Sequence, residues 1–337
     1  MKALVTGGGG FLGSRIVQML HARGDEVVAL GRGAYPHHEL AGIRTMQADI
    51  RNAEAIRTAC RGMDVVFHVA ALPGIWGRRS EFREINVDGT RNVIGACQTC
   101  GVPKLVFTSS PSVVFGRDPL CGVDESQPYP GKYLAHYPET KAAAEQMVLA
   151  ANGPGLATVA LRPHLIWGPG DPHLIPRVIA RARAGQLVQV GEGDNLVDIT
   201  YIDNVAEAHL LAADALSPSS PCAGRTYFIS QGEPVSLWPW LNDILRAVGA
   251  PEVNRRVSFR KAYTAGAACE AVYRVLGVNQ EPPMSRFLAS QLAHSHYFDI
   301  SAAKHDIGYI PRVSVSEGLV RMIEHLNRGE VSSAALQ

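Results

Sequence analysis

The chain has 337 residues, of which 46% are hydrophobic and 19% are charged, so it can bury a large core. The 32 lysines and arginines nearly balance 31 aspartates and glutamates, which gives a formal net charge of +1. This balance argues against a nucleic-acid-binding protein, and the apolar content argues against a disordered chain. At roughly 150 residues per domain, the length predicts about two domains.

The start of the chain, Met-Lys-Ala-Leu-Val-Thr, has too short an apolar run for a secretory signal, and no stretch predicts a membrane-spanning helix. Six cysteines are too few for a disulfide scaffold. Cys97 and Cys100 form a CxxC that could be a redox or zinc motif, although the simpler interpretation is the end of a helix. The histidine pairs at 37–38 and 294/296 lack nearby carboxylates or thiols, so we expect no bound metal and a cytoplasmic location.

Short apolar runs alternate with helical patterns through residue 167. Runs that are apolar throughout are typical of parallel strands covered on both faces. We therefore predict an α/β fold with a Rossmann-type, doubly wound parallel sheet that binds ligands beyond the carboxyl ends of its strands. The predicted strands are 2–6, 26–30, 65–69, 104–108 and 157–161, and the predicted helices are 11–23, 52–60, 86–99 and 138–151.

The pattern changes after residue 167 and becomes mostly helical. Residues 253–300 carry many apolar side chains without clear strands, which indicates either core packing or a lid over an apolar substrate cavity. The later predicted elements are helices 174–184 and 204–215 and strands 187–190 and 226–230, the last rejoining the first sheet. The predicted domains are a dinucleotide-binding domain of residues 1–167, rejoined by 201–230, and a smaller, mostly helical C-terminal substrate-binding domain of 168–200 and 231–330.

A glycine-rich loop stands between the first predicted strand and the first predicted helix. Gly7, Gly10 and Gly13 form GxxGxxG in the segment TGGGGFLG. Glycines allow a tight turn and close approach to a pyrophosphate, and the helix N-terminus supplies N–H donors. The position of the motif, at the end of the first strand, predicts a dinucleotide site.

The residues after the second strand bear on the choice of cofactor. An NAD site usually has an acidic residue there, whereas this chain has Arg32, which could pair with a 2′-phosphate. We therefore favour NADP, while NAD remains the alternative if Arg32 is only a solvated loop residue. Asp49 follows the apparent third strand and could reach the adenine amino group, or it could cap a helix.

A Tyr–Lys pair stands at the start of a predicted helix. Tyr137 and Lys141 are four residues apart and therefore share one helix face. A neighbouring ammonium and an oxidised nicotinamide would lower the phenol pKa, making Tyr137 a usable acid and base. Tyr129 and Tyr133 compete for this role but have no lysine four residues later. Ser110, which ends the Thr-Ser-Ser segment after a strand, can hydrogen-bond a carbonyl group.

The segments TGGGGFLG, FHVAA, NVDGTRNV, TSS, YPETK and LRPHLIWGPGD together resemble the extended short-chain dehydrogenase/reductase family over essentially the whole chain. The resemblance implies that Tyr137 donates a proton to the carbonyl oxygen and that Lys141 binds the nicotinamide ribose. It also implies that Ser110 polarises the carbonyl and that Asn86 supports the network. Ser112 could replace Ser110, because the loop SSPSVVFG is one residue longer than in the sugar epimerases.

The same resemblance implies where the cofactor lies, with Asp49, Ile50, Ala70 and Ala71 at the adenosine and Pro163 at the nicotinamide. It further implies a homodimer formed by the helices near 86–100 and 138–151. The expected cofactor-binding residues are Gly7, Gly10, Phe11, Leu12, Gly13, Arg32, Asp49, Ile50, Ala70, Ala71, Tyr137, Lys141 and Pro163.

Segment 191–203 bears on the substrate class. Family members that act on nucleotide sugars carry an arginine there for the diphosphate, and this chain has Val197 instead. The arginine-rich segment 177–183 could compensate, but a solvated helix face is the simpler interpretation. The variant NLVD-x-TYIDNVA resembles the branch of 3β-hydroxysteroid dehydrogenases and decarboxylating sterol 4-carboxylate dehydrogenases.

TSSPSV, TKAAAEQMVLAANG and LATVALRPHLIWGPGD are most similar to the bacterial 2-alkyl-3-oxoalkanoate reductases of long-chain olefin biosynthesis. This resemblance implies NADPH-dependent reduction of a 3-keto group in a hydrophobic small molecule, with olefin-pathway enzymes as possible partners. The expected substrate-wall residues, each of which could instead be simple packing, are Trp76, Pro111, Ser112, His164 and Trp167.

Three alternatives remain open at this point. One is an NAD-dependent 3β-hydroxysteroid or sterol dehydrogenase, and another is a nucleotide-sugar epimerase or dehydratase. The third is a non-enzymatic, NADP-sensing regulator, although such proteins tend to lose the Tyr–Lys pair that this chain retains.

Overall fold

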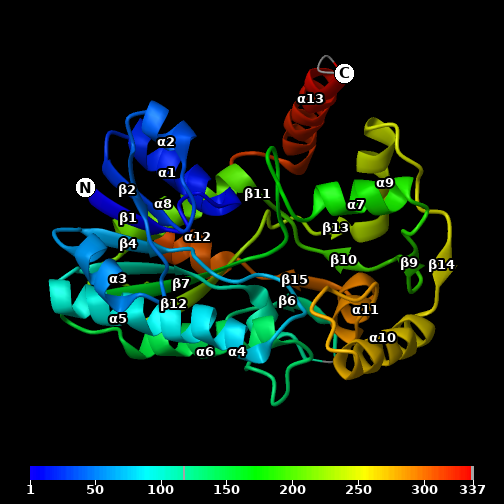
Figure 1. Cartoon of the computed structure of the whole chain (residues 1–337), viewed down its shortest axis with the longest axis horizontal. Coiled ribbons are helices and arrows are strands. Elements are labelled where there is room, and N and C mark those ends of the chain that lie inside the picture. The colour runs from blue at the N-terminus through cyan, green and yellow to red at the C-terminus, as the bar shows by residue number, and fades with distance from the viewer. Residues whose placement is uncertain (117, 335–337) are drawn as a thin grey trace.

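The computed structural model describes residues 1–116 and 118–334. Its centre is a seven-stranded sheet in which every neighbouring pair is parallel (Figure 1). The strand order is β12-β7-β5-β4-β1-β2-β3, so the direction of winding changes between β1 and β4. This confirms the predicted doubly wound sheet. The strands are β1 (Lys2–Thr6), β2 (Glu26–Gly31), β3 (Arg44–Gln47), β4 (Val65–His68), β5 (Lys104–Thr108), β7 (Ala157–Pro163) and β12 (Arg225–Ile229).

Helices cover both faces of this sheet, because successive apolar side chains of a strand point to opposite faces. In β1, Ala3 and Val5 join the core beneath α1 (Phe11–Ala22) and α8 (Ile202–Ala215), whereas Leu4 joins the core on the other side. That second core lies under α3 (Ala53–Cys60), α5 (Gly89–Cys100) and α6 (His136–Ala150) (Figure 1).

A second, smaller sheet of order β13-β10-β15-β6 lies beyond the carboxyl ends of the first (Figure 1). Its strands are β6 (Leu120–Val123), β10 (Leu196–Val197), β13 (Val235–Ser236) and β15 (His296–Phe298). Two short parallel pairs accompany it, β8 (Ile166–Trp167) with β11 (Thr200–Tyr201) and β9 (Gln189–Val190) with β14 (Arg256–Val257). The surrounding helices are α7 (Ile175–Arg183), α9 (Leu237–Ala247), α10 (Phe259–Val275), α11 (Arg286–Ala293), α12 (Ser301–Ile307) and α13 (Val315–Ala334).

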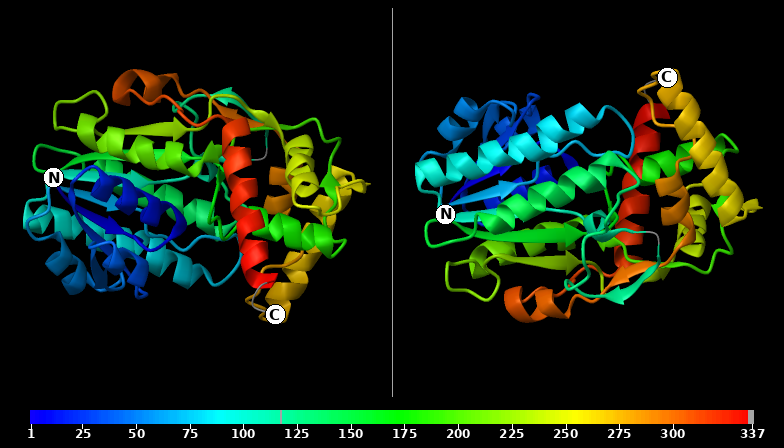
Figure 2. Two further views of the ribbon diagram at one scale, coloured as in Figure 1. Left: turned by 90° about the horizontal axis from the view of Figure 1, so that it is seen from above. Right: turned by 90° about the horizontal axis from the view of Figure 1, so that it is seen from below.

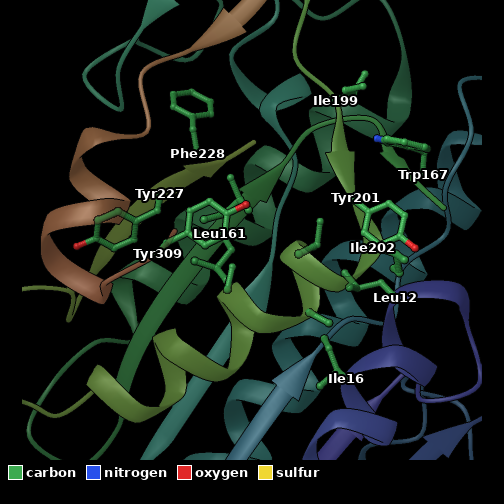
Figure 3. Close-up of a cluster of buried hydrophobic side chains, with 14 of the residues drawn as sticks. Leu12, Ile16, Leu161, Trp167, Ile199, Tyr201, Ile202, Tyr227, Phe228 and Tyr309 are labelled. Carbon is green, nitrogen blue, oxygen red and sulfur yellow. The ribbon is translucent and has the colours of Figure 1, made fainter. Parts of the chain in front are cut away.

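The two parts of the chain share a core. Figure 3 shows Trp167, Tyr201 and Ile202 lying together beside Leu12 of α1, and the rings of Trp167 and Tyr201 are 5.4 Å apart. α13 lies across the junction, as Figure 2 shows. β12 adds an edge strand beside β7, while β6 leaves the first sheet and joins the second. The proposed division into two domains stays a prediction.

Several predicted boundaries need correction. Asn52, not Asp49, caps α3, because its side chain accepts a hydrogen bond from Ala55 N at 3.1 Å. The helix predicted from residue 86 begins earlier, as a π-helix at Arg83–Asp88 that continues into α5. Segment 253–300 contains α10 and α11 between two short strands. Two short helices, α2 (Pro36–Leu40) and α4 (Arg79–Phe82), have no counterpart in the prediction.

The cysteines and the surface add two observations. All six cysteines are free, and α5 ends at Cys100 before Gly101, which has a left-handed backbone. The interpretation of the CxxC as a helix end is therefore confirmed. Within residues 1–116 and 118–334, no helix is both long and apolar enough to cross a membrane.

Candidate active site

The glycine-rich loop connects β1 to the N-terminus of α1. Gly7 has a left-handed backbone with φ of +70°, and its carbonyl accepts a hydrogen bond from Gly10 N at 2.9 Å. A Cβ on Gly13 would overlap the carbonyl oxygen of Gly7, so the first turn of α1 can pack here only with glycine. The first N–H groups of α1 are free of intrahelical partners, as an anion-binding helix end requires. The side chain of Leu12 is buried in the core, which leaves only its backbone to the cofactor.

A cavity of about 280 Å³ opens where β1 and β4 diverge. This is the position at which a doubly wound sheet binds a dinucleotide. The glycines and small residues leave room for an adenosine, so the residues present fit the cofactor that the motif predicts. The cavity brings together seven of the expected cofactor residues, namely Gly7, Gly10, Arg32, Asp49, Ile50, Ala70 and Ala71. Phe11 lies on the neighbouring side of the loop, facing a second hollow.

The rim of this cavity includes a residue that the sequence did not predict, Tyr35. Tyr35 packs against Gly9 and Gly31, where any Cβ would overlap its ring. No sequence motif marks Tyr35 beyond its closeness to Arg32, which is exposed at the same rim. Asp49 binds Arg51, with Oδ2 and Nη2 2.7 Å apart, and this hydrogen bond lowers the pKa of Asp49. The charge of Arg32 also lowers the pKa of Asp49, but among the described residues no hydrogen bond or ion pair holds the Arg32 guanidinium.

Tyr137 and Lys141 lie on the first two turns of α6, next to the end of β5. Lys141 Nζ donates a hydrogen bond to the Thr108 carbonyl at 2.5 Å and lies 4.1 Å from the centre of the Phe107 ring. Burial lowers the pKa of Lys141 to about 7, while Glu145 acts in the opposite direction. Burial also raises the pKa of Tyr137 to about 12, opposed by a hydrogen bond with Ser110. The phenol is therefore held in its protonated, donating form in the free protein.

Ser110 and Ser112 form one hydroxyl pair after β5. Their Oγ atoms are 2.9 Å apart, and Ser112 N donates to Ser110 Oγ at 3.2 Å. Ser110 also contacts Tyr137, so it links the phenol to Ser112. Both serines lie in the same cavity wall as Tyr137. Pro111 is buried and begins the 3-10 helix Pro111–Val114, so it shapes the turn and does not line this cavity.

Asn86 is a positioning residue that lies between the loop after β4 and α6. Its Oδ1 accepts a hydrogen bond from Leu72 N at 2.7 Å, and its Nδ2 donates to the Leu72 carbonyl at 3.2 Å. Nδ2 also donates to Thr140 Oγ1 at 3.1 Å, between Tyr137 and Lys141 in the sequence. Asn86 therefore ties the loop after β4 to α6.

A buried chain of hydrogen bonds, which sequence reasoning missed, continues from Asn86 to the glycine-rich loop. Thr90 Oγ1 donates to the Asn86 carbonyl at 2.6 Å, so it must accept from His68 Nε2 at 2.9 Å. His68 Nδ1 then accepts from Thr6 Oγ1 at 2.8 Å, and Thr6 accepts from Ala70 N at 3.3 Å. Each group has one consistent role when His68 is neutral, and burial lowers its pKa to about 3. The chain fixes Thr6 and Ala70 around the cofactor cavity.

A buried ion pair joins α6 to β7. Glu145, one turn after Lys141, receives hydrogen bonds from Arg162 Nε at 2.9 Å and Nη2 at 2.7 Å. Tyr129 donates a third, at 2.6 Å. Tyr129 is thus committed to Glu145, and Tyr133 donates to the Val113 carbonyl at 2.9 Å. These contacts account for the two tyrosines that competed with Tyr137 in the sequence.

Tyr137, Ser110 and Ser112 line a cavity of about 400 Å³ between the two parts of the chain. Of the expected substrate residues, Ser112 and His164 line it, together with Pro163. Its wall is largely apolar and includes Phe115, Leu165, Leu174, Trp238, Phe287 and Leu292.

The two expected tryptophans lie elsewhere. Trp167 is fully buried against Tyr201 and Trp240, so its role is core packing. Trp76 lines an adjoining cavity of about 300 Å³ and donates from Nε1 to the Val278 carbonyl at 2.9 Å. It thereby ties the loop after β4 to the end of α10.

Segment 253–300, for which core packing and a lid over a cavity were the two interpretations, shows some of each. α11 contributes cavity wall through Phe287 and Leu288, whereas Val272, Val275 and Leu276 of segment 253–300 are exposed. Pro73, on the loop after β4, lies in the walls of both the cavity of about 280 Å³ and the cavity of about 400 Å³.

Two further observations bear on substrate and metal binding. Val197 is fully buried in β10, so it faces no ligand. Arg177 and Arg181 of α7 lie in the substrate cavity wall, and Arg177 pairs with Glu281 at 3.0 Å. Among the residues that the structure describes, no group of three or more histidines, cysteines or carboxylates could hold a metal ion.

Comparison with known proteins assigns this site to a family. Residues 4–260 match the model of the 3-beta hydroxysteroid dehydrogenase/isomerase family. The chain belongs to this family. It is accordingly an NAD(P)-dependent oxidoreductase of the extended short-chain dehydrogenase/reductase type, as the motifs implied.

Individual relatives agree with this assignment. The chain is 48% identical to the 2-alkyl-3-oxoalkanoate reductase of Stenotrophomonas maltophilia, over 96% of this chain and 98% of that protein. It is 34% identical to the 3-beta-hydroxysteroid dehydrogenase of Mycolicibacterium neoaurum, over 96% and 91%. Among solved structures, MoeE5 in complex with UDP-glucose and NAD superposes with a TM-score of 0.75 at 27% identity, over 98% of this chain and 99% of that one.

Proposed function

We propose that the enzyme uses NADPH to reduce the 3-keto group of a long-chain 2-alkyl-3-oxoalkanoic acid to the 3-hydroxy acid. The observation that carries this proposal is the largely apolar cavity of about 400 Å³ whose wall includes Tyr137, Ser110 and Ser112. Each methylene buried there contributes about 0.8 kcal/mol to binding. The 48% identity to a reductase of that name supports the same substrate class.

The chemistry at the ketone follows from the side chains. When bound, the reduced nicotinamide supplies the hydride that adds to the carbonyl carbon. Tyr137 donates its phenolic proton to the carbonyl oxygen, and Ser110 donates a hydrogen bond to the same atom. Lys141, held by the Thr108 carbonyl, provides positive charge that stabilises the phenolate left behind. Asn86 keeps the catalytic helix in register with the cofactor loop.

NADPH is the proposed cofactor because Arg32 stands at the rim of the adenosine cavity with no acidic residue after β2. Replacing Arg32 with alanine should raise the KM for NADPH more than the KM for NADH, since only NADPH carries a 2′-phosphate. An equal change in both constants would remove Arg32 from the argument.

The substrate proposal is tested by following NADPH oxidation with 2-alkyl-3-oxoalkanoic acids and with steroid ketones of similar apolar area. We expect the higher kcat/KM for the keto acids. A clear preference for steroids would favour the second candidate, an NAD-dependent 3β-hydroxysteroid or sterol dehydrogenase, which the family match and the 34% identical relative support. Buried Val197 argues against the nucleotide-sugar alternative, because it cannot neutralise a diphosphate.

Three further points belong to the same proposal. A homodimer would pair α5 and α6, which lie side by side on one face of the sheet. Light scattering coupled to size-exclusion chromatography tests this.

The six free cysteines are compatible with the reducing cytoplasm. A role in olefin biosynthesis would follow if enzymes that make the keto acid and consume the hydroxy acid act alongside this one.

A further inference from the structure

Two histidines form a buried pair in the wall of the substrate cavity. His164 follows β7 and His296 begins β15, and each is 4% exposed. His164 Nε2 and His296 Nδ1 are 2.7 Å apart, and His296 Nε2 lies 2.9 Å from the Gln291 carbonyl oxygen. Both rings lie in the cavity wall, along with Tyr137 and Ser110. The reaction described above uses neither of them.

The carbonyl of Gln291 fixes the direction of these hydrogen bonds. A carbonyl can only accept, so His296 Nε2 carries a hydrogen, and in the neutral ring Nδ1 is then an acceptor. His164 Nε2 must therefore donate to His296, which leaves His164 Nδ1 as a bare lone pair. No residue that the structure describes donates to this atom. Burial lowers the pKa of His164 well below its usual value and that of His296 to about 4, so both imidazole rings are neutral in the free protein.

His164 stands next to the catalytic serines. In the parallel pair of β5 and β7, Thr108 is opposite Leu161, and Ser109 N donates to the Leu161 carbonyl at 2.6 Å. β5 ends at Thr108 and the chain then turns into the 3-10 helix Pro111–Val114, while β7 ends at Pro163, directly before His164. Ser110, Ser112 and His164 line the same cavity. The ring of Phe115, directly after that 3-10 helix, is 5.7 Å from the His164 ring.

We propose that His164 Nδ1 binds the carboxyl group of the substrate. This inference rests on the proposed function. In a 3-oxo acid the carboxyl carbon is two bonds from the reacting ketone carbon, so it must bind directly beside Ser110 and Tyr137. Of the polar groups in the cavity, His164 is the one that neighbours the serines and has an unpartnered atom. One proton from solvent joins the carboxylate and the neutral imidazole, giving an imidazolium–carboxylate hydrogen bond, while His164 Nε2 continues to donate to His296.

Arg181 is the rival carboxylate ligand. It is half-buried in the same cavity wall on α7, and its guanidinium has no hydrogen-bond or ion-pair partner among the described residues. It lies on a different element from the serines, however, whereas His164 extends the strand beside them. The other titratable or charged groups in the cavity wall or near the histidine pair are Tyr137, His173, Arg177, Asp198, Glu281 and His294.

The first test compares an acid with its uncharged ester in the oxidative direction, where the substrates are stable. Wild type, His164→Asn and Arg181→Gln are assayed with NADP⁺ on 2-hexyl-3-hydroxydecanoic acid and its methyl ester. Loss of a hydrogen bond to a charged group should lower kcat/KM of His164→Asn for the acid by roughly tenfold to 100-fold. The value for the ester should fall clearly less than the value for the acid, and far-UV circular dichroism shows that the variant folds.

Other outcomes overturn the inference. Equal losses for acid and ester, or a loss confined to the acid in Arg181→Gln, would refute the role of His164 while leaving the proposed function intact. Wild-type protein that oxidises neither compound but oxidises a steroid alcohol would overturn the proposed function itself, and this inference with it.

A second test needs no variant. The unreactive 2-hexyldecanoic acid is titrated by calorimetry into the enzyme–NADP⁺ complex near neutral pH, in phosphate and in Tris buffer. The ligand is ionised in solution, so the proposed complex takes up about one proton, and the heats in the two buffers differ by the difference in their ionisation enthalpies. The matching amide should show no difference. Binding of the acid without proton uptake would refute the proposal.

Discussion

Replacing Glu145 with glutamine should destabilise the protein far more than the loss of an ordinary salt bridge. The Glu145 side chain is 0% exposed and that of Arg162 is 3% exposed, and two hydrogen bonds join them. The glutamine keeps the shape but removes the charge, leaving the Arg162 guanidinium uncompensated in the core. Breaking a buried pair in this way costs about 3–5 kcal/mol. With a urea m-value of about 3 kcal/mol per M, the unfolding midpoint should fall by roughly 1 M or more.

The same helix offers a matched control. Glu139 pairs with Arg79 at 2.5 Å, but their side chains are 35% and 68% exposed, so Glu139→Gln should cost less than about 1 kcal/mol. Urea unfolding followed by far-UV circular dichroism measures both variants. The double variant Glu145→Gln with Arg162→Met should recover part of the loss, because no buried charge remains unpaired. Equal midpoints for Glu145→Gln and Glu139→Gln would refute the reasoning.

Three more predictions concern catalysis and acid stability. Tyr137→Phe should lower kcat by about 10²–10⁴-fold without changing the Kd for NADPH measured by fluorescence, because only the proton donor is lost. Asn86→Ala should lower kcat by roughly tenfold to 100-fold through misplacement of α6, with a much smaller change in substrate KM; a change in KM alone would contradict this. Burial lowers the pKa of His68 to about 3 and those of His209 and His296 to about 4. Below pH ~6.5 the unfolded chain binds protons that the folded protein cannot bind, so the stability decreases as the pH decreases. Between about pH 7 and pH 5 each of these histidines removes about 2 kcal/mol of stability. The raised pKa of Asp198 returns about 1 kcal/mol, while the lowered pKa of Lys141 removes less than about 1 kcal/mol more over this range, so a net loss remains, and a Tm that rises as the pH falls over this range would refute these pKa shifts.

The sequence is most informative where its signals are local. The β1–α1 glycine loop, the apolar strands and the Tyr137–Lys141 spacing each involve residues within one turn or one strand, and the structure has all three. The residues expected at the cofactor, which follow strands, line one cavity, because parallel strands bring their carboxyl ends to one edge.

The features that the sequence did not predict depend on contacts between distant segments, and such contacts leave no local sequence pattern. The second sheet is built from strands of two to four residues, too short for a recognisable period. His164 and His296 are 132 residues apart in the chain. Aromatic residue type alone also does not distinguish a cavity wall from a core, which explains the misplacement of Trp167. Tyr35 had no signal, because its contact with Gly9 and Gly31 is purely steric.

The loop after β4 has a kinetic consequence. Pro73 lies in the wall of both cavities, Leu72 is fastened to Asn86, and Trp76 is fastened to the end of α10. Because the loop after β4 lines both cavities, a ligand that moves this loop in one cavity also changes the shape of the other. We expect NADPH and the keto acid to bind in a compulsory order, with NADPH first. Bound NADPH fixes the position of the loop after β4, and the alkyl chains of the substrate then pack against that loop. Initial-rate and product-inhibition patterns would show this order directly.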